Sequence, residues 1–105
     1  MSGWPKLPTK VLGAGGPIRI RQVKKLKHSD GTVCWGTWDD ATRTIRVDGT
    51  APPEHRWRVY FHEWAHAAID DSGVGNLLAD GFIETLCDAF ATARLQELRD
   101  TLDQP

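Results

Sequence analysis

The chain has 105 residues, of which 40% are hydrophobic and 26% charged, a composition typical of one small globular domain. Its formal net charge of -1 excludes the strong basic excess of a generic nucleic-acid or membrane binder. It has neither an apolar run near the roughly 18 residues that cross a bilayer nor the apolar segment of a secretory signal. The two cysteines, Cys34 and Cys87, do not form a disulfide framework or a CxxC zinc knuckle. We therefore expect a cytoplasmic protein with reduced core cysteines, no membrane partner and no nucleic-acid partner.

The charges are distributed unevenly. Residues 1–29 carry seven Lys or Arg and no acid, whereas residues 70–105 carry eight acids and two Arg. The simpler interpretation is a solvated basic strand face and a solvated acidic helix surface. The alternative is a basic edge that receives an acidic partner.

The first half of the chain has the pattern of a sheet. Residues 1–16 are rich in Pro and Gly and are expected to be a flexible lead-in to a single domain over residues 17–105. Residues 18–23 alternate apolar and polar side chains, residues 32–38 are β-branched and aromatic, and residues 44–48 again alternate. Together these segments predict a three-stranded antiparallel sheet.

The second half has the pattern of two helices. Pro53 suits a first helical turn, and a helix is expected from about residue 54 to about residue 70. The run Ser72-Gly-Val-Gly75 ends it. A second helix is expected from between residues 76 and 80 to about residue 99. A sheet followed by two helices packed on one of its faces predicts an α+β fold.

The first predicted helix contains the motif His62-Glu63-Trp64-Ala65-His66. Residues four apart lie on one helical face, so two imidazoles at this spacing can bind one cation. Glu63 lies about 100° round the helix, beside that cation. The motif predicts His62 and His66 as metal ligands and Glu63 as the catalytic base. The alternative is a pair of hydrogen-bonded histidines beside a solvated glutamate.

The second predicted helix offers a third ligand, which a zinc site needs if its fourth position is to remain open for water. Glu84 and Asp88 are carboxylates four apart in an apolar stretch, and their repulsion calls for a cation opposite. We therefore assign Glu84 as the third ligand of one zinc ion per chain, with Asp88 accepting the outer N–H of a ligand histidine. Asp70, too close to His66 along one helix, and Asp80, better suited to cap the second helix, are the rival ligands. A solvated acidic stripe is the remaining alternative.

The HExxH motif followed by a distal ExxxD resembles the gluzincin arrangement of metallopeptidases, in which the distal Glu binds zinc and the Asp supports a ligand histidine. Within that group the chain is most similar to the small ImmA/IrrE-type metallopeptidases. The resemblance covers roughly residues 32–95, and the segment from Glu84 to Ala91 is similar to that family's Glu-x-x-Ala-Asn-x-Phe-Ala. Cys87 and Asp88 stand where Ala and Asn are usual. The resemblance implies zinc-dependent hydrolysis of peptide bonds in an extended peptide or protein.

The expected mechanism uses water that zinc brings to a pKa of about 7, with Glu63 accepting its proton and returning it to the leaving amine. Gluzincins generally place a His or Tyr after the third ligand to stabilise the oxyanion, and none follows Glu84 here. Tyr60 and His55 are the candidates for this stabilising role, with a core position the alternative for Tyr60. His28 is expected to be a lone surface histidine.

Four tryptophans are candidates for either a substrate groove or the core. An exposed sheet edge would let an extended peptide add as a strand. Trp35 and Trp38 are three apart and face opposite sides of a regular strand, so at most one of them is expected to line the groove. Trp57 and Trp64 share a helical face and are expected to pack in the core.

Three functions fit the sequence, and the first is a minimal zinc endopeptidase. The second is a non-catalytic, metal-stabilised protein-interaction module or regulator, suggested by the small size and the absent downstream donor. Retention of Glu63 argues against this module, because a structural zinc site needs no base. The third is a nucleic-acid-associated protease with a phosphate tether whose binding would fall steeply with salt. That tether would consist of Lys24, Lys25 and Lys27.

Overall fold

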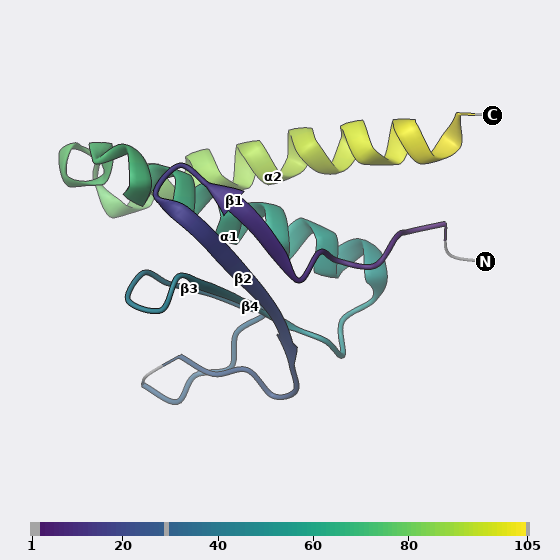
Figure 1. Ribbon diagram of the computed structural model, residues 1–105, viewed down its shortest axis with the longest axis horizontal. Coiled ribbons are helices and arrows are strands. Elements are labelled where there is room, and N and C mark those ends of the chain that lie inside the picture. The colour runs from purple at the N-terminus through teal and green to yellow at the C-terminus, as the bar shows by residue number, and fades with distance from the viewer. Residues whose placement is uncertain (1–2, 29, 105) are drawn as a thin grey trace.

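The computed structural model describes residues 3–28 and 30–104 (Figure 1). Four strands are followed by a long helix, a short 3-10 helix and a second long helix. In chain order these are β1 (Lys10–Gly13), β2 (Gly16–Val23), β3 (Gly36–Asp39), β4 (Thr44–Asp48), α1 (Pro53–Ser72), η1 (Val74–Leu77) and α2 (Asp80–Asp103). The α+β class is as expected.

The sheet is mixed and has four strands in the order β1-β2-β4-β3. β1 pairs antiparallel with β2, and β3 pairs antiparallel with β4, but β2 and β4 are parallel. The predicted three-stranded antiparallel sheet is therefore wrong in strand number and in direction. β1 lies within the stretch expected to be a flexible lead-in and was missed because Lys10–Gly13 is short and ends in glycine. The parallel pair arises because the long connection after β2 carries the chain past β4 to the outer edge.

The third strand is shorter than its sequence pattern suggests. It begins at Gly36, and the residues before it lie in the connection from β2. There the backbone N–H of Cys34 donates to the carbonyl of Leu26, and Lys27 and Val33 form an isolated bridge. β3 is an edge strand, so one of its sides remains unpaired within the described chain.

The helices do not both lie on the sheet. Figure 1 shows α1 between the sheet and α2, and α2 packs mainly against α1. α1 begins with Pro53 in its first turn and ends at Gly73, whose φ of 76° favours glycine. α2 begins at Asp80, but its N-cap is Ala79 without a side-chain cap, so Asp80 does not cap the helix as predicted. Its charge still interacts favourably with the positive end of the helix dipole.

The core lies between the sheet and α1. Alternate residues of the two central strands are almost fully buried, and the parallel register places Ile20 beside Ile45. Val59 and Phe61 of α1 pack onto them, and Trp57 and Trp64 pack against this core as partly buried side chains, as expected. Burial of this apolar face holds α1 at a fixed height above the sheet.

A polar anchor fixes the C-terminal half of α1. Both carboxylate oxygens of Asp71 accept hydrogen bonds from Arg43, at 2.8 and 2.9 Å, and the backbone N–H of Gly15 donates to the same carboxylate at 3.0 Å. The hydrogen bonding to Arg43 is the largest cause, and the bond from Gly15 the next, of a pKa for Asp71 that is lowered to about 2. The anchor thereby ties the β1–β2 turn and the β3–β4 turn to the helix that carries the HExxH motif.

Among the described residues, no helix is both long enough and apolar enough to cross a membrane.

Candidate metal centre

The two histidines of the HExxH motif meet on one face of α1. His62 and His66 are one helical turn apart, and their Nε2 atoms lie 3.2 Å from each other. Both side chains are largely but not fully covered, with 18% and 22% of their surface exposed. Their nitrogens are therefore shielded from bulk solvent on most sides but still open to the groove.

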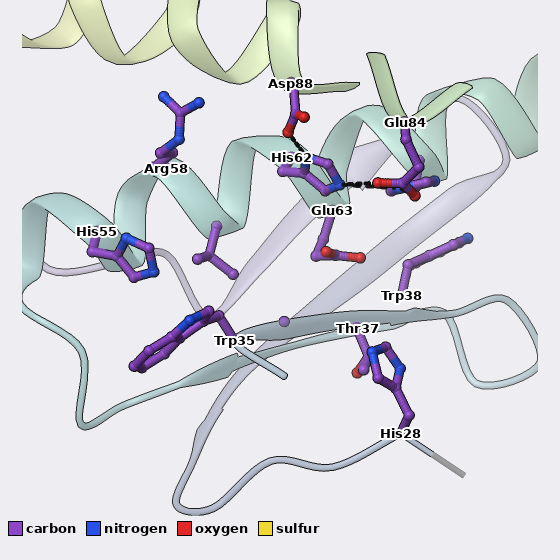
Figure 2. A pocket seen from close by; sticks show the side chains of 13 residues that line it. His28, Trp35, Thr37, Trp38, His55, Arg58, His62, Glu63, Glu84 and Asp88 are labelled. Atoms are coloured by element: carbon purple, nitrogen blue, oxygen red, sulfur yellow. Dashed lines mark hydrogen bonds and ion pairs between the residues drawn. The ribbon is translucent and has the colours of Figure 1, made fainter. Parts of the chain in front are cut away.

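Glu84 joins them from the first turns of α2. Its Oε2 lies 3.1 Å from Nε2 of His62, and its Oε1 lies 2.9 Å from Nε2 of His66. Figure 2 shows this carboxylate approaching His62 from the neighbouring helix. The packing of α2 against α1 thus brings together the three residues that the sequence assigns as ligands. Each of the three offers one ligand atom within 4.8 Å of the others.

Asp88 occupies the outer side of His62. Its Oδ1 lies 2.9 Å from Nδ1 of His62, as Figure 2 shows with a dashed line. A carboxylate in this place accepts the Nδ1–H and leaves Nε2 pointing at the carboxylate of Glu84. Either a metal ion between Nε2 and Glu84 or a proton on Nε2 supplies the positive charge that this contact requires.

The ligand groups are also spaced closely enough for zinc. Tetrahedral zinc with ligand bonds of roughly 2.0–2.1 Å holds its ligand atoms about 3.3 Å apart. The two Nε2 atoms lie 3.2 Å apart, Nε2 of His62 lies 3.1 Å from Oε2 of Glu84, and Nε2 of His66 lies 2.9 Å from the other oxygen, Oε1. Two imidazoles and one carboxylate form a donor set that zinc accepts in catalytic sites. The residues present therefore fit a zinc ion.

Glu63 lies next to this cluster, between α1 and β3 (Figure 2). Burial raises its pKa to about 7, an effect that nearby His62 opposes and nearby Glu84 reinforces. β3 comes close at this point because Gly36 has no side chain. A Cβ there would lie 2.4 Å from Cγ1 of Val59 and 3.1 Å from Cγ of Glu63. The glycine therefore allows the sheet to cover the glutamate.

These residues line a groove of about 650 Å³ between α2, α1 and the β3 edge. Both Trp35 and Trp38 line it, so the expectation that at most one would do so is wrong. The alternation rule does not apply to the pair because Trp35 precedes the first residue of β3. Trp38 donates from Nε1 to Asp70 at 2.6 Å. Asp70 is thereby engaged with the sheet, and neither it nor Asp80 belongs to the His–His–Glu cluster.

The two candidates for oxyanion stabilisation lie in different places. Tyr60 is buried in the core beside Trp57 and Phe61 and does not line the groove, and burial raises the pKa of its hydroxyl. His55 does line the groove, where its ring meets that of Trp35 edge to face at 5.0 Å between centroids. The structure therefore brings His55, and not Tyr60, to the site.

The sequence analysis did not identify two of the residues that line the groove. His28 is exposed, as expected, and it also lines the groove from the loop between β2 and β3. No local sequence pattern predicts that His28 lies at the groove, because its position depends on the path of the long connection between β2 and β3. Arg58 also lines the groove, and it lies four residues before His62 on the same helical face. That spacing is a signal that could have identified Arg58.

Comparison of the chain with family models, with curated proteins and with solved structures found no match. The side-chain geometry and the sequence motif are therefore the grounds for assigning a function.

Proposed function

We propose that this protein is a zinc-dependent metallopeptidase that hydrolyses peptide bonds in extended peptide or protein segments. The observation that carries the proposal is the convergence of His62, His66 and Glu84 beside a buried Glu63. Asp88 supports it by orienting His62. The arrangement resembles that of the ImmA/IrrE-type metallopeptidases.

Each residue of the site has its own role in the proposed hydrolysis. A bound zinc ion supplies Lewis acidity and activates water at neutral pH. Glu63 holds a carboxylate next to the ligand cluster, where it can take up a proton and then give it to the leaving amine. His62 keeps its ligand nitrogen aimed at the cluster because Asp88 holds the opposite nitrogen.

The edge of β3 provides a place for the substrate backbone. Within the described chain β3 pairs only with β4, so its outer edge offers unpaired backbone N–H and carbonyl groups beside the groove. An extended peptide that adds to this edge is held by main-chain hydrogen bonds, whatever its sequence. Glu63 reaches the same groove from α1, so an added peptide runs past the proposed base.

The test is cleavage of fluorescently labelled, unfolded casein by the wild-type chain and by Glu63→Gln, purified in parallel with zinc added. We expect cleavage by the wild type, and loss of cleavage in the variant with its metal content and circular dichroism spectrum unchanged. Equal cleavage by both would trace the activity to a contaminant and contradict the proposal.

A second function is favoured by one observation. Of the two candidates for oxyanion stabilisation, Tyr60 lies in the core, and His55 lies at the end of the groove away from Glu84 (Figure 2). A metal-stabilised interaction module needs no such group. It predicts metal binding without turnover of casein or of a peptide library, and Glu63→Gln would then leave partner binding unchanged.

A further inference from the structure

The groove carries basic side chains that the metal centre does not use. His55 and Arg58 lie at one end of it, and His28 lies near Thr37 on the wall opposite α1 (Figure 2). In the described ranges 3–28 and 30–104, none of the three forms an ion pair with an acidic side chain. The acidic residues that line the groove all belong to the metal centre and are Glu63, Glu84 and Asp88. The groove is therefore acidic at the ligands and basic beyond them.

His55 and Arg58 flank this basic end from two sides. Both precede His62 on the groove face of α1, at the end away from Glu84 (Figure 2). Figure 2 also shows Arg58 rising toward α2, whereas His55 lies across from Trp35. The guanidinium of Arg58 stays charged at any physiological pH and presents several N–H donors in one plane. These donors face an open groove and have no carboxylate partner among the described residues.

His55 contributes a second unsatisfied group. Its Nε2 atom is buried and has no hydrogen-bond partner in the described part of the chain. Buried polar atoms are nearly always hydrogen-bonded, so an exception inside a groove indicates a partner that comes from a ligand. Trp35, which contacts the His55 ring and is 53% exposed, adds an apolar surface beside it.

From these features we propose that the groove selects a peptide carrying a carboxylate about two to three residues from the scissile bond, bound by Arg58 and His55. The inference rests on the proposed function, because it takes the occupant of the groove to be a peptide. Along α1, Arg58 and His55 lie about 6 and 10 Å from His62, given a helical rise of about 1.5 Å per residue. An extended peptide advances about 3.3 Å per residue, so these distances correspond to about two and three residues.

The chemistry of this end favours a carboxylate over other groups. A guanidinium pairs with the two oxygens of a carboxylate through two parallel hydrogen bonds. The methylene groups of a glutamate side chain can lie on the exposed Trp35 ring. The carboxylate has two sources, an internal Asp or Glu side chain or the C-terminus of the substrate.

Cleavage of a peptide library measures this preference. Wild-type protein digests a proteome-derived peptide library, and mass spectrometry of the products gives residue frequencies around each cut. We expect Asp, Glu or a free C-terminus to be enriched two or three residues from the cut. For matched acetylated decapeptides with Glu or Gln at that position, kcat/KM should differ about tenfold. Amidated and free-acid versions separate the internal side chain from the terminus as the source.

The variants assign the preference to Arg58. Arg58→Gln should lose most of the Glu-over-Gln preference, so that kcat/KM for the Glu peptide falls toward the value for the Gln peptide. Arg94→Gln is the matched control, because Arg94 lies outside the groove and pairs with Glu97, and it should keep the full preference. Cleavage without an acidic preference, or a preference that survives in Arg58→Gln, would overturn the inference and leave the peptidase proposal intact.

A binding measurement keeps the two proposals distinguishable. Fluorescence anisotropy with labelled Glu and Gln decapeptides is measured on Glu63→Gln and on Glu63→Gln/Arg58→Gln. Tighter binding of the Glu peptide that requires Arg58, with no cleavage by the wild type, would support the carboxylate site and contradict the peptidase proposal. Equal binding of both peptides to both variants would overturn the carboxylate site.

Discussion

Two polar clusters on α1 differ in whether their charges balance within the chain. Near the C-terminal end of α1, Asp71 accepts two hydrogen bonds from Arg43 and one from Gly15, so every charged group there has a partner. His66 lies about one and a half turns earlier and His62 about two and a half, and the Nε2 atoms of both lie within 3.1 Å of the carboxylate of Glu84. The first cluster is complete as it stands and holds the fold together. The second brings three possible ligand atoms together, and we propose that a zinc ion completes it.

The largest expected effect separates chemistry from metal binding. Glu63→Gln keeps the size of the side chain and removes its basicity, so hydrolysis should fall by at least about 100-fold. Metal content should remain that of the wild type, because Glu63 is not in the ligand cluster. Steady-state cleavage of the best library peptide, with elemental analysis of the same samples, checks this. A fall of less than about threefold would remove Glu63 from its role as base.

Asp88 tests whether the outer side of His62 matters to the metal. Asp88→Ala leaves Nδ1 of His62 without its acceptor, so the imidazole loses its fixed tautomer and zinc affinity should fall about 10-fold to 100-fold. Competition with a fluorescent zinc chelator measures the affinity. Asp100→Ala is the control, because Asp100 is an exposed carboxylate of the same helix and, among residues 3–28 and 30–104, its side chain accepts a hydrogen bond from Gln96 alone. Equal zinc affinities for the two variants would show that Asp88 does not support metal binding.

Substitution in the cluster of Asp71 and Arg43 should lower stability and leave zinc affinity nearly unchanged. Asp71→Asn removes the charge that Arg43 contacts and should lower the free energy of unfolding by about 1 kcal/mol. Zinc affinity should stay within about twofold of the wild type. Urea unfolding by circular dichroism gives the stability, and chelator competition gives the affinity. A large loss of zinc affinity with unchanged stability would reverse the roles assigned to the two clusters.

The same pair predicts a pH dependence. Because the folded-state pKa of Asp71, about 2, lies below its ordinary value of 3.8, its charge stabilises the fold above about pH 4. This contribution is lost as the pH falls toward 2. The stability difference between the wild type and Asp71→Asn should therefore be constant from pH 5 to 7 and disappear between pH 4 and 2. A difference that grows on acidification would contradict this account of the anchor.

The smallest expected effect concerns the wall of the groove. Trp35 is half exposed and packs on His55, so Trp35→Ala should raise KM for peptides a few-fold and leave kcat and stability nearly unchanged. Trp57→Ala is the contrasting variant, because Trp57 packs against the core and should cost stability instead. Thermal unfolding and peptide kinetics on both proteins distinguish the two positions.

The sequence predicted the helical part of the molecule better than the sheet. Both helices and the ligand cluster depend on local periodicity, so the spacing of His62 and His66 sufficed to place them on one face. The contact between Glu84 and the histidines was predicted because Glu84 and Asp88 repel each other in an apolar stretch and call for a cation opposite them. The strand order depends on where a long connection carries the chain, and no local pattern specifies that. For the same reason His28 and the parallel pairing of β2 with β4 were not foreseen.

The most direct test of the metal centre is the zinc content of the wild type beside that of Glu84→Ala and Glu97→Ala, after loading with zinc and gel filtration. Glu84 and Glu97 are both exposed carboxylates of α2, and only Glu84 contacts the two histidines. We predict one zinc per chain in the wild type and in Glu97→Ala, and almost none in Glu84→Ala. Full retention of zinc without Glu84, or no zinc in the wild type, would contradict the three-ligand site.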